Sequence, residues 1–272
     1  MRSLLQAGDP PPFEILNPDG RSDCILICEH AGNVVPAALG RMGLDDDDFG
    51  RHYAVDIGAR GVTDHLSRLL DAPAIVANYS RLVVDINRTL DHETTFPTTG
   101  EGKPIPGNVG LSDADKAQRI DEIYKPFDQA VRDVIESVLD HGGRPMLLAV
   151  HSYTPVFFGT PRPWECAVLW REDWPMSRAM IGHLRALGLN VGDNEPYDSR
   201  KQCFGTLDRH AGGHGDGVDG QFLWPHALVE IRNNLIQNDK DQQSWAEILA
   251  GVVHKIMADE SNRGLPPDTP LG

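Results

Sequence analysis

The sequence predicts an α/β protein whose mostly parallel sheet is covered by helices on both faces. Two short apolar runs, residues 24–28 (CILIC) and 145–150 (PMLLAV), have the compactness of buried strands. Helical patterns alternate with such strands along the chain, which is typical of a parallel sheet with helical crossovers. No internal repeat or long linker interrupts the alternation, so we expect one domain over residues 1–272, with a core at about 21–260 and a loose tail at 261–272.

The remaining elements follow from the same patterns. Four further segments have strand character: residues 74–77, 82–86, 166–170 and 227–231. The predicted helices are residues 58–70, a long segment from Ser112 to Val138, residues 176–187 and residues 243–257. Ser112 is expected to cap the long segment, and Pro126 should kink it or split it into two helices.

Composition limits the classes of partner. The chain has 272 residues, of which 40% are hydrophobic, so it can bury a sizeable core. Its formal net charge is −15, which argues against a nucleic-acid partner because no basic patch could easily dominate such a field. No segment approaches the roughly 20 apolar residues needed to span a bilayer, so we expect no membrane contact. The sequence indicates no oligomeric state.

The cysteines and the N-terminus predict a cytoplasmic protein. Cys24, Cys28, Cys166 and Cys203 form no CxxC pair, and their spacing fits reduced thiols better than a disulfide framework. The first residues, MRSLLQAGDPPP, lack an apolar stretch long enough for a signal peptide.

Polar residues stand directly after the most apolar strands. The run CILIC leads into Glu29 and His30, and PMLLAV leads into His151. Glu230 lies in a third strand, and Asp56 precedes a predicted helix. In open α/β sheets ligands bind at such strand ends, and we expect the polar stretches 92–110, 153–163 and 198–220 to contribute to the site.

Each of these residues also has a purely structural interpretation. A single histidine at a strand end is often a hydrogen-bonded structural group, and Asp56 could be a helix cap. Glu230 could form a buried salt bridge with Arg88 or Arg232. None of the spacings is a self-sufficient metal motif such as HExxH, so the residues alone leave both interpretations open.

Five blocks of the chain resemble the N-formylglutamate amidohydrolase family, in the order in which they occur there. They read ILICEHAGNVVP, VDIGARGVTDHL, NYSRLVVDINR, AVHSYTP and ALVEIRNNLI, and extend from about Ile25 to Ile236. The resemblance implies an α/β/α sandwich around a mixed sheet, similar to zinc carboxypeptidases and cell-wall amidases. The first block has Cys-Glu-His-Ala-Gly where the histidine-degrading members tend to have Pro-His-Ser-Gly, which leaves the exact substrate open.

The resemblance also implies roles for individual residues. His30, Asp56 and His151 are the candidate ligands of zinc or another divalent metal, with Glu29 as the alternative to Asp56. Glu230 is the candidate general base for a zinc-activated water. The candidate substrate-binding residues are Arg81, Asn87, Arg88, Tyr153, Arg232 and Asn233. Tyr153 and the catalytic candidate His210 are expected to stabilise the tetrahedral oxyanion.

The resulting hypothesis is an amidohydrolase of amino-acid metabolism. It would hydrolyse the amide bond of N-formylglutamate or of a related N-acyl acidic amino acid, which is a small-molecule substrate. One alternative is a zinc amidase or peptidase that acts on a larger acyl or peptidyl substrate. Another is a catalytically silent protein of the same fold that binds a small ligand.

Overall fold

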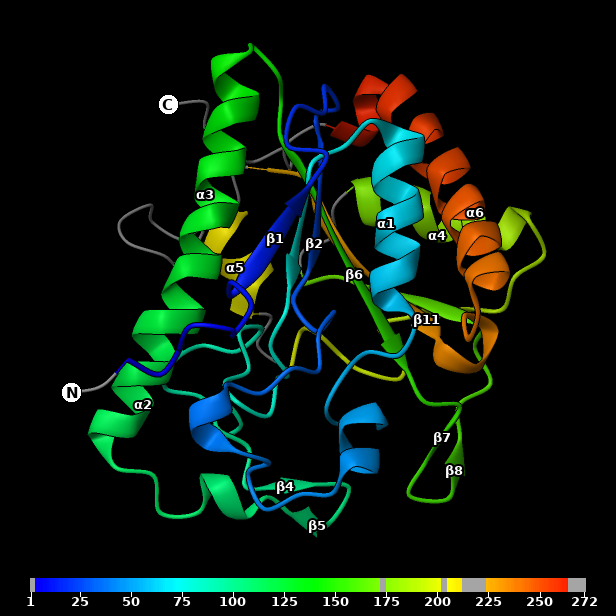
Figure 1. Ribbon diagram of the computed structural model, residues 1–272. Coiled ribbons are helices and arrows are strands. Elements are labelled where there is room, and N and C mark those ends of the chain that lie inside the picture. Colours follow the sequence, from blue (N-terminus) through cyan, green and yellow to red (C-terminus); the bar gives the residue numbers. More distant parts are fainter. Residues whose placement is uncertain (1–2, 172–174, 202–204, 212–223, 264–272) are drawn as a thin grey trace.

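A computed structural model describes residues 3–171, 175–201, 205–211 and 224–263 of the chain (Figure 1). In this part a seven-stranded sheet has the order β1-β3-β2-β6-β11-β9-β10. Neighbouring strands run parallel, except that β1 is antiparallel to β3 and β9 to β11. The strands are β1 (Phe13–Leu16), β2 (Cys24–Cys28), β3 (Ala74–Ala77), β6 (Met146–Tyr153), β9 (Cys166–Leu169), β10 (Val191–Asp193) and β11 (His226–Arg232).

Helices cover both faces of this sheet, so the predicted three-layer α/β/α fold with a mixed, mostly parallel sheet is confirmed (Figure 1). One face carries α1 (Ala59–Leu70), α4 (Pro175–Ala186) and α6 (Asp239–Ala258). The other carries α2 (Asp113–Arg119), α3 (Lys125–Asp140) and α5 (Gly205–His210). Two hairpins lie outside the sheet, β4 (Thr99–Gly100) with β5 (Lys103–Pro104), and β7 (Val156–Phe157) with β8 (Thr160–Pro161).

The central strands are apolar at every position because both of their faces are covered. In β2, Leu26 packs with the α1 and α6 side, whereas Ile25 and Ile27 pack with the α3 side. In β6, Leu148 packs with the α1 and α6 side and Leu147 with the α3 side. Alternate residues of a strand point to opposite faces, so a strand buried on both faces has a continuous apolar run instead of an alternating one.

The long helical segment is divided as its proline predicts. The Ser112 hydroxyl accepts a hydrogen bond from the Asp115 backbone N–H and caps α2. A π-helical turn, Ile120–Tyr124, separates α2 from α3, and Pro126 occupies the first turn of α3. Proline is tolerated there because the first N–H groups of a helix have no partner within it.

Phe127 anchors α3 on the sheet, and its loss should destabilise the fold. The side chain is fully buried and meets the ring of Phe13 from β1 edge-on, with the ring centroids 6.4 Å apart. Phe127→Ala is expected to lower the free energy of unfolding by about 3–5 kcal/mol, because it removes apolar contacts and leaves a cavity. Leu139→Ala, on the same helix but 40% exposed, should cost no more than about 0.5 kcal/mol. Urea titration of both variants tests this, and equal losses would contradict it.

One predicted strand is wrong. Residues 82–86 form turns, although Leu82, Val83, Val84 and Ile86 are all buried. The backbone N–H groups of this segment donate to loop carbonyls: Val83 donates to Ser80, and Asp85 donates to Thr95. Burial alone produced the apolar pattern, since none of the described strands pairs with this segment. The short strands β1 and β10, the hairpins and α5 were not predicted.

Other element boundaries shift by a few residues. Strand β6 continues through His151, Ser152 and Tyr153, so these residues lie in the strand and not after it. Helix α6 begins four residues before the predicted start, where the Asn238 side chain accepts from the Asp241 N–H. Cys203 and the tail residues 264–272 lie outside the described residues, whereas Cys24, Cys28 and Cys166 are buried free thiols.

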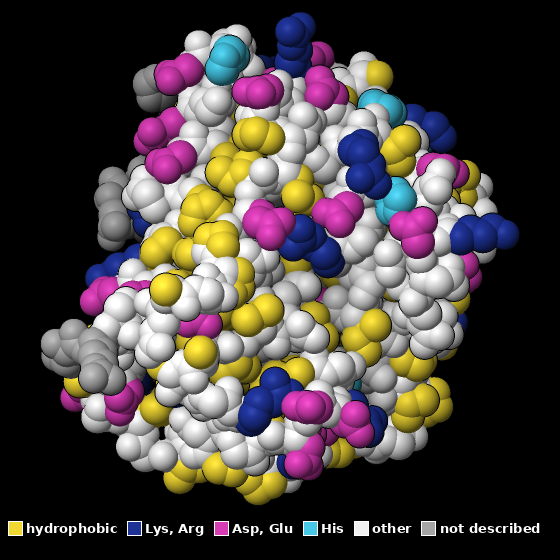
Figure 2. All heavy atoms as spheres, viewed as in Figure 1, with side chains coloured by type: hydrophobic (Ala, Val, Ile, Leu, Met, Phe, Trp, Pro, Cys, Tyr) yellow, Lys and Arg dark blue, Asp and Glu magenta, His cyan; other side chains and the backbone are white. Residues whose placement is uncertain are grey.

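The surface view shows where apolar side chains gather on one face of the molecule. They lie over the edge strand β1 and the adjacent flank of α3, while acidic and basic side chains are interspersed on the side of α1 and α6 (Figure 2). In the described ranges no helix combines the length and the apolar content needed to cross a bilayer.

The topology brings three strand ends together. Because β2, β6 and β11 are parallel, their carboxyl ends lie at the same edge of the sheet. His30 follows β2 by two residues, and His151 lies near the end of β6. Glu230 of β11 is the direct register partner of His151. Paired residues of adjacent strands point to the same face, so both side chains are directed towards the side of the sheet that α3 covers.

Candidate metal centre and substrate pocket

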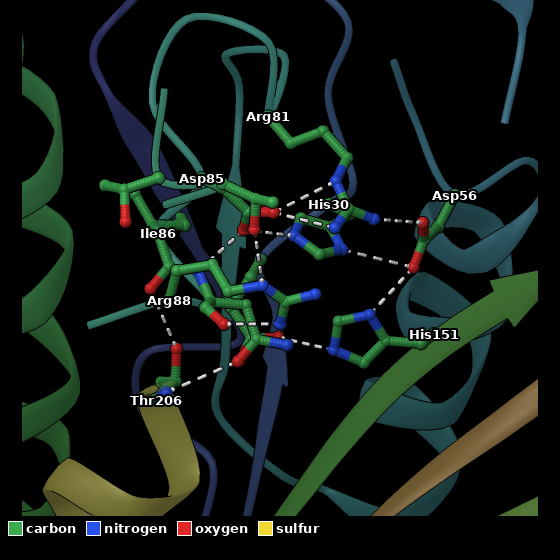
Figure 3. Close-up of polar contacts among 12 residues, drawn as sticks. His30, Asp56, Arg81, Asp85, Ile86, Arg88, His151 and Thr206 are labelled. Carbon is green, nitrogen blue, oxygen red and sulfur yellow. Dashed lines mark hydrogen bonds and ion pairs between the residues drawn. The ribbon is translucent and has the colours of Figure 1, made fainter. Parts of the chain in front are cut away.

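His30, Asp56 and His151 converge at this edge of the sheet, although they are distant in sequence (Figure 3). The Nδ1 atoms of His30 and His151 lie 3.4 Å and 2.7 Å from Asp56 Oδ2. The Asp56 backbone is fixed to the same strand end, because its N–H donates to the His30 carbonyl. All three side chains are buried, and one donor atom from each lies within 4.8 Å of the others.

The donor set suits a divalent metal. Two imidazole nitrogens and a carboxylate oxygen are common zinc ligands, and three protein ligands are typical of catalytic zinc. His30 Nδ1 is buried and forms no hydrogen bond, although Asp56 Oδ2 lies 3.4 Å away. Buried polar atoms are normally satisfied, so an unsatisfied nitrogen aimed at two other ligand atoms fits a metal site. These three residues could therefore hold a metal ion.

Each histidine has a second carboxylate behind it. His30 Nε2 lies 2.8 Å from Asp85 Oδ1, and His151 Nε2 lies 3.0 Å from Glu29 Oε2. Carboxylates in this position fix the tautomer and the orientation of metal-binding imidazoles. Glu29 therefore contacts His151 through Nε2 and does not belong to the cluster of three, an arrangement that favours Asp56 over Glu29 as the carboxylate of the candidate site.

Charge within the cluster is tightly balanced. Burial disfavours the charged form of Asp56, but the two histidines outweigh it and hold the pKa of this carboxyl well below its usual range. Burial also disfavours the His151 imidazolium, yet Glu29 and Asp56 raise the pKa of His151 well above its ordinary value. The site is thus built to hold positive charge between carboxylates.

Asp85 connects His30 to Arg81. Its Oδ2 accepts from Arg81 Nη2 and Nε at 2.7 Å and 3.2 Å, and its Oδ1 accepts from the Asn87 backbone N–H at 3.0 Å. Burial would raise the pKa of Asp85, but Arg81 and His30 lower it well below its ordinary value. Arg81 Nη1 also lies 3.6 Å from Asp56 Oδ1, so this guanidinium is occupied by two carboxylates of the site.

Asp85→Asn should weaken metal binding without removing a ligand. The amide keeps the size of the side chain but loses the charge that orients His30 and offsets Arg81. We expect affinity for Zn²⁺ to fall about 10–100-fold, the usual effect of altering an outer partner of a metal-binding histidine. Competition with a chromogenic chelator measures this. Asp133→Asn, on the exposed face of α3, is the matched control, and unchanged affinity in Asp85→Asn would contradict the assigned role.

Helix α5 holds the loop that carries Asp85, Asn87 and Arg88. The Thr206 hydroxyl donates to the Ile86 carbonyl, and its backbone N–H donates to Asn87 Oδ1 (Figure 3). Arg209 donates to the carbonyls of Ile86 and Arg88, at 3.0 Å and 3.2 Å. No described strand pairs with this loop, so side-chain bonds such as these hold it in position.

Glu230 is a buried carboxylate without an ionic partner. Its Oε2 is buried and accepts no hydrogen bond, and it forms no ion pair with Arg88, Arg232 or any other described cation. Burial raises the pKa of Glu230 to about 7. The structural alternative for this residue, a buried salt bridge, is therefore not what the described residues show.

A small pocket joins these groups. Its volume is about 120 Å³. The lining residues are His30, His52, Asp56, Arg81, Asn87, Arg88, His151, Ser152, Tyr153, Leu169, Tyr197, Leu228 and Glu230. Ligand pockets for drug-sized molecules have roughly 300–1,000 Å³, so this one favours a small ligand.

The predicted substrate-binding residues divide into two groups. Arg81, Asn87, Arg88 and Tyr153 line the pocket, although the Tyr153 hydroxyl donates to the Trp164 carbonyl at 2.6 Å. Arg88 donates to Thr94 Oγ1 and to the Asn87 carbonyl, and no described carboxylate pairs with it. Arg88 is therefore the cation of the pocket that remains available to an anion.

Three predicted residues lie elsewhere. Arg232 donates to Asn234 Oδ1 and to the carbonyls of Arg162 and Pro163, outside the pocket. Asn233 lines a neighbouring hollow. His210 Nε2 lies 2.8 Å from Asp128 Oδ1 of α3, so its ring faces α3 and not the pocket.

The sequence did not indicate His52, Tyr197 or Arg162. His52 and Tyr197 line the pocket, and Arg162 lies behind Tyr197. All three lie in loops, and none follows an apolar strand as His30 and His151 do. Of the three polar stretches expected at the site, 153–163 contributes one lining residue, Tyr153, whereas 92–110 and the described residues of 198–220 contribute none.

Comparisons with known proteins show the family and the fold of this chain. The family model described as N-formylglutamate amidohydrolase matches residues 22–237. The crystal structure of a gene product from Agrobacterium tumefaciens is 30% identical, covers 94% of this chain and 98% of its own, and superposes with a TM-score of 0.87. The N-formylglutamate amidohydrolase from Ralstonia eutropha is 16% identical over 92% of this chain and 98% of its own, with a TM-score of 0.61, and shares the fold.

No curated protein matches the sequence of this chain. The family match nevertheless covers most of the chain, from before β2 to the residues after β11, and includes every residue of the pocket. This chain belongs to the N-formylglutamate amidohydrolase family and is an amidohydrolase.

Proposed function

We propose that the chain hydrolyses the amide bond of N-formylglutamate or of a related N-acyl acidic amino acid, with a metal at His30, Asp56 and His151. The observation that carries this proposal is Glu230, a buried carboxylate with no ionic partner that lines the same pocket as the three candidate ligands. The family match supplies the reaction class.

The metal would be held by His30 Nδ1, His151 Nδ1 and the Asp56 carboxylate. Nitrogen and carboxylate ligands favour zinc among the common divalent ions of hydrolases. When bound, such an ion polarises the acyl carbonyl and lowers the pKa of water from about 15.7 to roughly 7. Asp85 and Glu29 orient the two imidazoles through their Nε2 atoms.

Glu230 would act as the general base and then as the general acid. Its raised pKa, about 7, lies near neutral pH, where a carboxylate can both accept and return a proton. Glu230 takes a proton from the attacking water as the new C–O bond forms. It then delivers a proton to the amide nitrogen as the C–N bond breaks, which gives the free amino acid and formate or another small carboxylate.

Arg88 would bind a carboxylate of the substrate. Its guanidinium lines the pocket without a described carboxylate partner, whereas Arg81 is held by Asp85 and Asp56. Guanidinium groups bind carboxylates through two parallel hydrogen bonds. This available cation supports an acidic substrate.

A second hollow supports one alternative within the same reaction class. It has a volume of about 500 Å³, and its lining includes Arg51, Glu101 and Asn233. It shares His52 with the small pocket, so a longer acyl or peptidyl group bound at the metal would have space there. A catalytically silent binding protein is less well supported, because Glu230 and the three candidate ligands lie together at one pocket.

The test combines metal content with turnover. Protein purified without added metal is analysed for zinc, and formate release is measured from N-formylglutamate and N-formylleucine. N-acetylglutamate and a glutamyl peptide complete the panel. About one zinc per chain, with turnover that requires the acidic side chain, supports the proposal. Turnover of the peptide alone selects the larger-substrate alternative, and failure to bind metal even when zinc is supplied would overturn the mechanism.

A further inference from the structure

We propose that Tyr197 is a catalytic hydrogen-bond donor to the acyl oxygen, and that Arg162 positions and polarises its hydroxyl. This inference rests on the proposed hydrolysis and deepens it, because it identifies the protein group that meets the charge developing on the substrate.

Tyr197 differs from the other tyrosines in the hydrogen bonding of its hydroxyl group. The chain has five tyrosines. Four donate their hydroxyl proton to a carboxylate or a backbone carbonyl: Tyr53 to Asp48, Tyr79 to Pro10, Tyr124 to Arg88 and Tyr153 to Trp164. Tyr197 lines the pocket, and its hydroxyl donates to no acceptor among the described residues. A tyrosine hydroxyl beside a polar pocket with its proton uncommitted is suited to donate to a ligand.

Arg162 lies beside Tyr197 and favours this role for its hydroxyl. The guanidinium carbon is 4.9 Å from the Tyr197 ring centroid, and a guanidinium can only donate, so a hydrogen bond between the two side chains has the Tyr197 oxygen as its acceptor. The hydroxyl proton of Tyr197 is then directed elsewhere. A cationic donor on the oxygen also makes the O–H a stronger donor, because bonds in a hydrogen-bonded chain polarise one another.

Arg162 is itself an unusual buried cation. It is 7% exposed, and its guanidinium carbon lies 4.5 Å from the ring centroid of Phe157 and 4.9 Å from that of Tyr197. The ring of Tyr153 is 5.7 Å away, and no ion pair joins Arg162 to a described carboxylate. Burying a charge without a counter-ion is costly, and aromatic faces compensate for part of that cost. A negative charge that develops on the substrate in the adjacent pocket would offset a further part of the cost of burying Arg162.

The surroundings of Tyr197 keep it protonated. Burial raises the pKa of Tyr197, and the Glu230 carboxylate adds to this effect, so the phenol remains a donor at neutral pH. Two other candidate donors of the pocket are committed, the Tyr153 hydroxyl to Trp164 and Arg81 to two carboxylates, and Arg88 has the proposed role of binding a substrate carboxylate. Tyr197 therefore supplies the available hydroxyl donor on the side of the pocket that also presents Glu230.

Tyr197→Phe tests the donor directly. We expect kcat to fall about 10²-fold, the lower end of the effect of removing one oxyanion donor, with KM within about threefold of the parent value. Zinc content should not change, because Tyr197 is not in the ligand cluster. Tyr79→Phe removes another buried hydroxyl, which donates to Pro10 away from the pocket, and should leave kcat unchanged. A parent-like kcat in Tyr197→Phe would overturn the inference while the hydrolysis itself stands.

A binding measurement separates this inference from the proposed function. A methylphosphonamidate of glutamate carries two oxygens on a tetrahedral phosphorus and resembles the hydrolytic transition state of N-acetylglutamate. Calorimetry should show that Tyr197→Phe weakens its binding by a factor similar to the loss in kcat. Equal affinity of the parent and Tyr197→Phe proteins would refute the donor role. If the parent protein hydrolysed none of the N-acyl amino acids, that result would count against the proposed function alone.

A double-mutant cycle tests the positioning role of Arg162. Arg162→Met keeps an apolar chain among the three rings, and we expect it to lower kcat at least 10-fold in the parent but little further in Tyr197→Phe. Arg162→Lys, which retains the charge, should recover part of the loss. Equal losses in both backgrounds would show a merely structural role, and a rise in KM with unchanged kcat would show that Arg162 binds a substrate carboxylate instead. Either result overturns the positioning role.

Discussion

His151→Ala is expected to abolish both metal binding and hydrolysis. The imidazole is buried between Asp56 and Glu29, and it supplies one of the two nitrogen donors of the cluster. Its removal leaves two buried carboxylates facing each other, with one nitrogen ligand remaining. The loss of zinc affinity should exceed the roughly 10–100-fold expected for an outer carboxylate, and turnover should fall to background. Elemental analysis after dialysis, together with the formate assay, measures both effects.

The control for this variant must separate local from global effects. His254→Ala removes an exposed histidine from α6 and should alter neither zinc content nor turnover. Thermal melting of both variants shows whether His151→Ala is still folded under assay conditions. If folded His151→Ala retained one zinc per chain at parental affinity, the metal site would have to lie elsewhere.

Glu230→Gln should separate catalysis from metal binding. Glutamine keeps the size of the side chain but cannot accept a proton from water, so we expect kcat to fall by about 10²–10⁴. Zinc content should stay at the parental value because Glu230 is not in the ligand cluster, and KM should change little. Steady-state kinetics on N-formylglutamate and elemental analysis measure the two properties on the same preparation.

A surface glutamate provides the matched comparison. Glu247→Gln makes the same chemical change on the exposed side of α6 and should leave kcat unchanged. Parental turnover in Glu230→Gln would remove this residue as the base. Simultaneous loss of zinc would instead assign it a structural part in the metal site.

The sheet was predictable where burial on both faces produced continuous apolar runs. The run CILIC corresponds to β2 with both ends correct, and PMLLAV corresponds to most of β6. Residues 82–86 have the same apolar character, but they are buried within a loop. An apolar run predicts that a segment is buried. A strand also needs a neighbouring strand with which to pair, and the residues of the segment itself do not show whether one is present. The edge strands β1 and β10 have no continuous buried apolar run, because β1 is only partly buried and β10 contains just Val191–Asp193, so no pattern revealed them.

The candidate site was predictable where chemistry follows a strand. His30, Asp56 and His151 were named from their places at strand and helix ends, and the structure brings them together. Their roles, like that of Glu230, stay predictions. Arg162 and Tyr197 were not named, because Arg162 follows β8 and Tyr197 follows β10, and no local pattern indicates that these two segments meet. His210 was expected at the pocket, but α5 turns its ring towards Asp128, and no sequence pattern indicated this helix.

Strand β6 gives the two sides of the site different dynamics. It is buried at every position and pairs with β11 from Leu147 to Tyr153 and with β2 from Met146 to Ala149, so we expect its amides to exchange with solvent deuterium only when the sheet opens. The loop at residues 81–88 is held by side chains of α5 and by its own turns, so we expect its amides to exchange through local opening, faster than those of β6. His151 thus belongs to the slowest-exchanging unit of the molecule, whereas Asn87 and Arg88 belong to a faster one. Motion of this loop would therefore reach Asn87 and Arg88 and, through Asp85, the His30 imidazole, while His151 keeps its position.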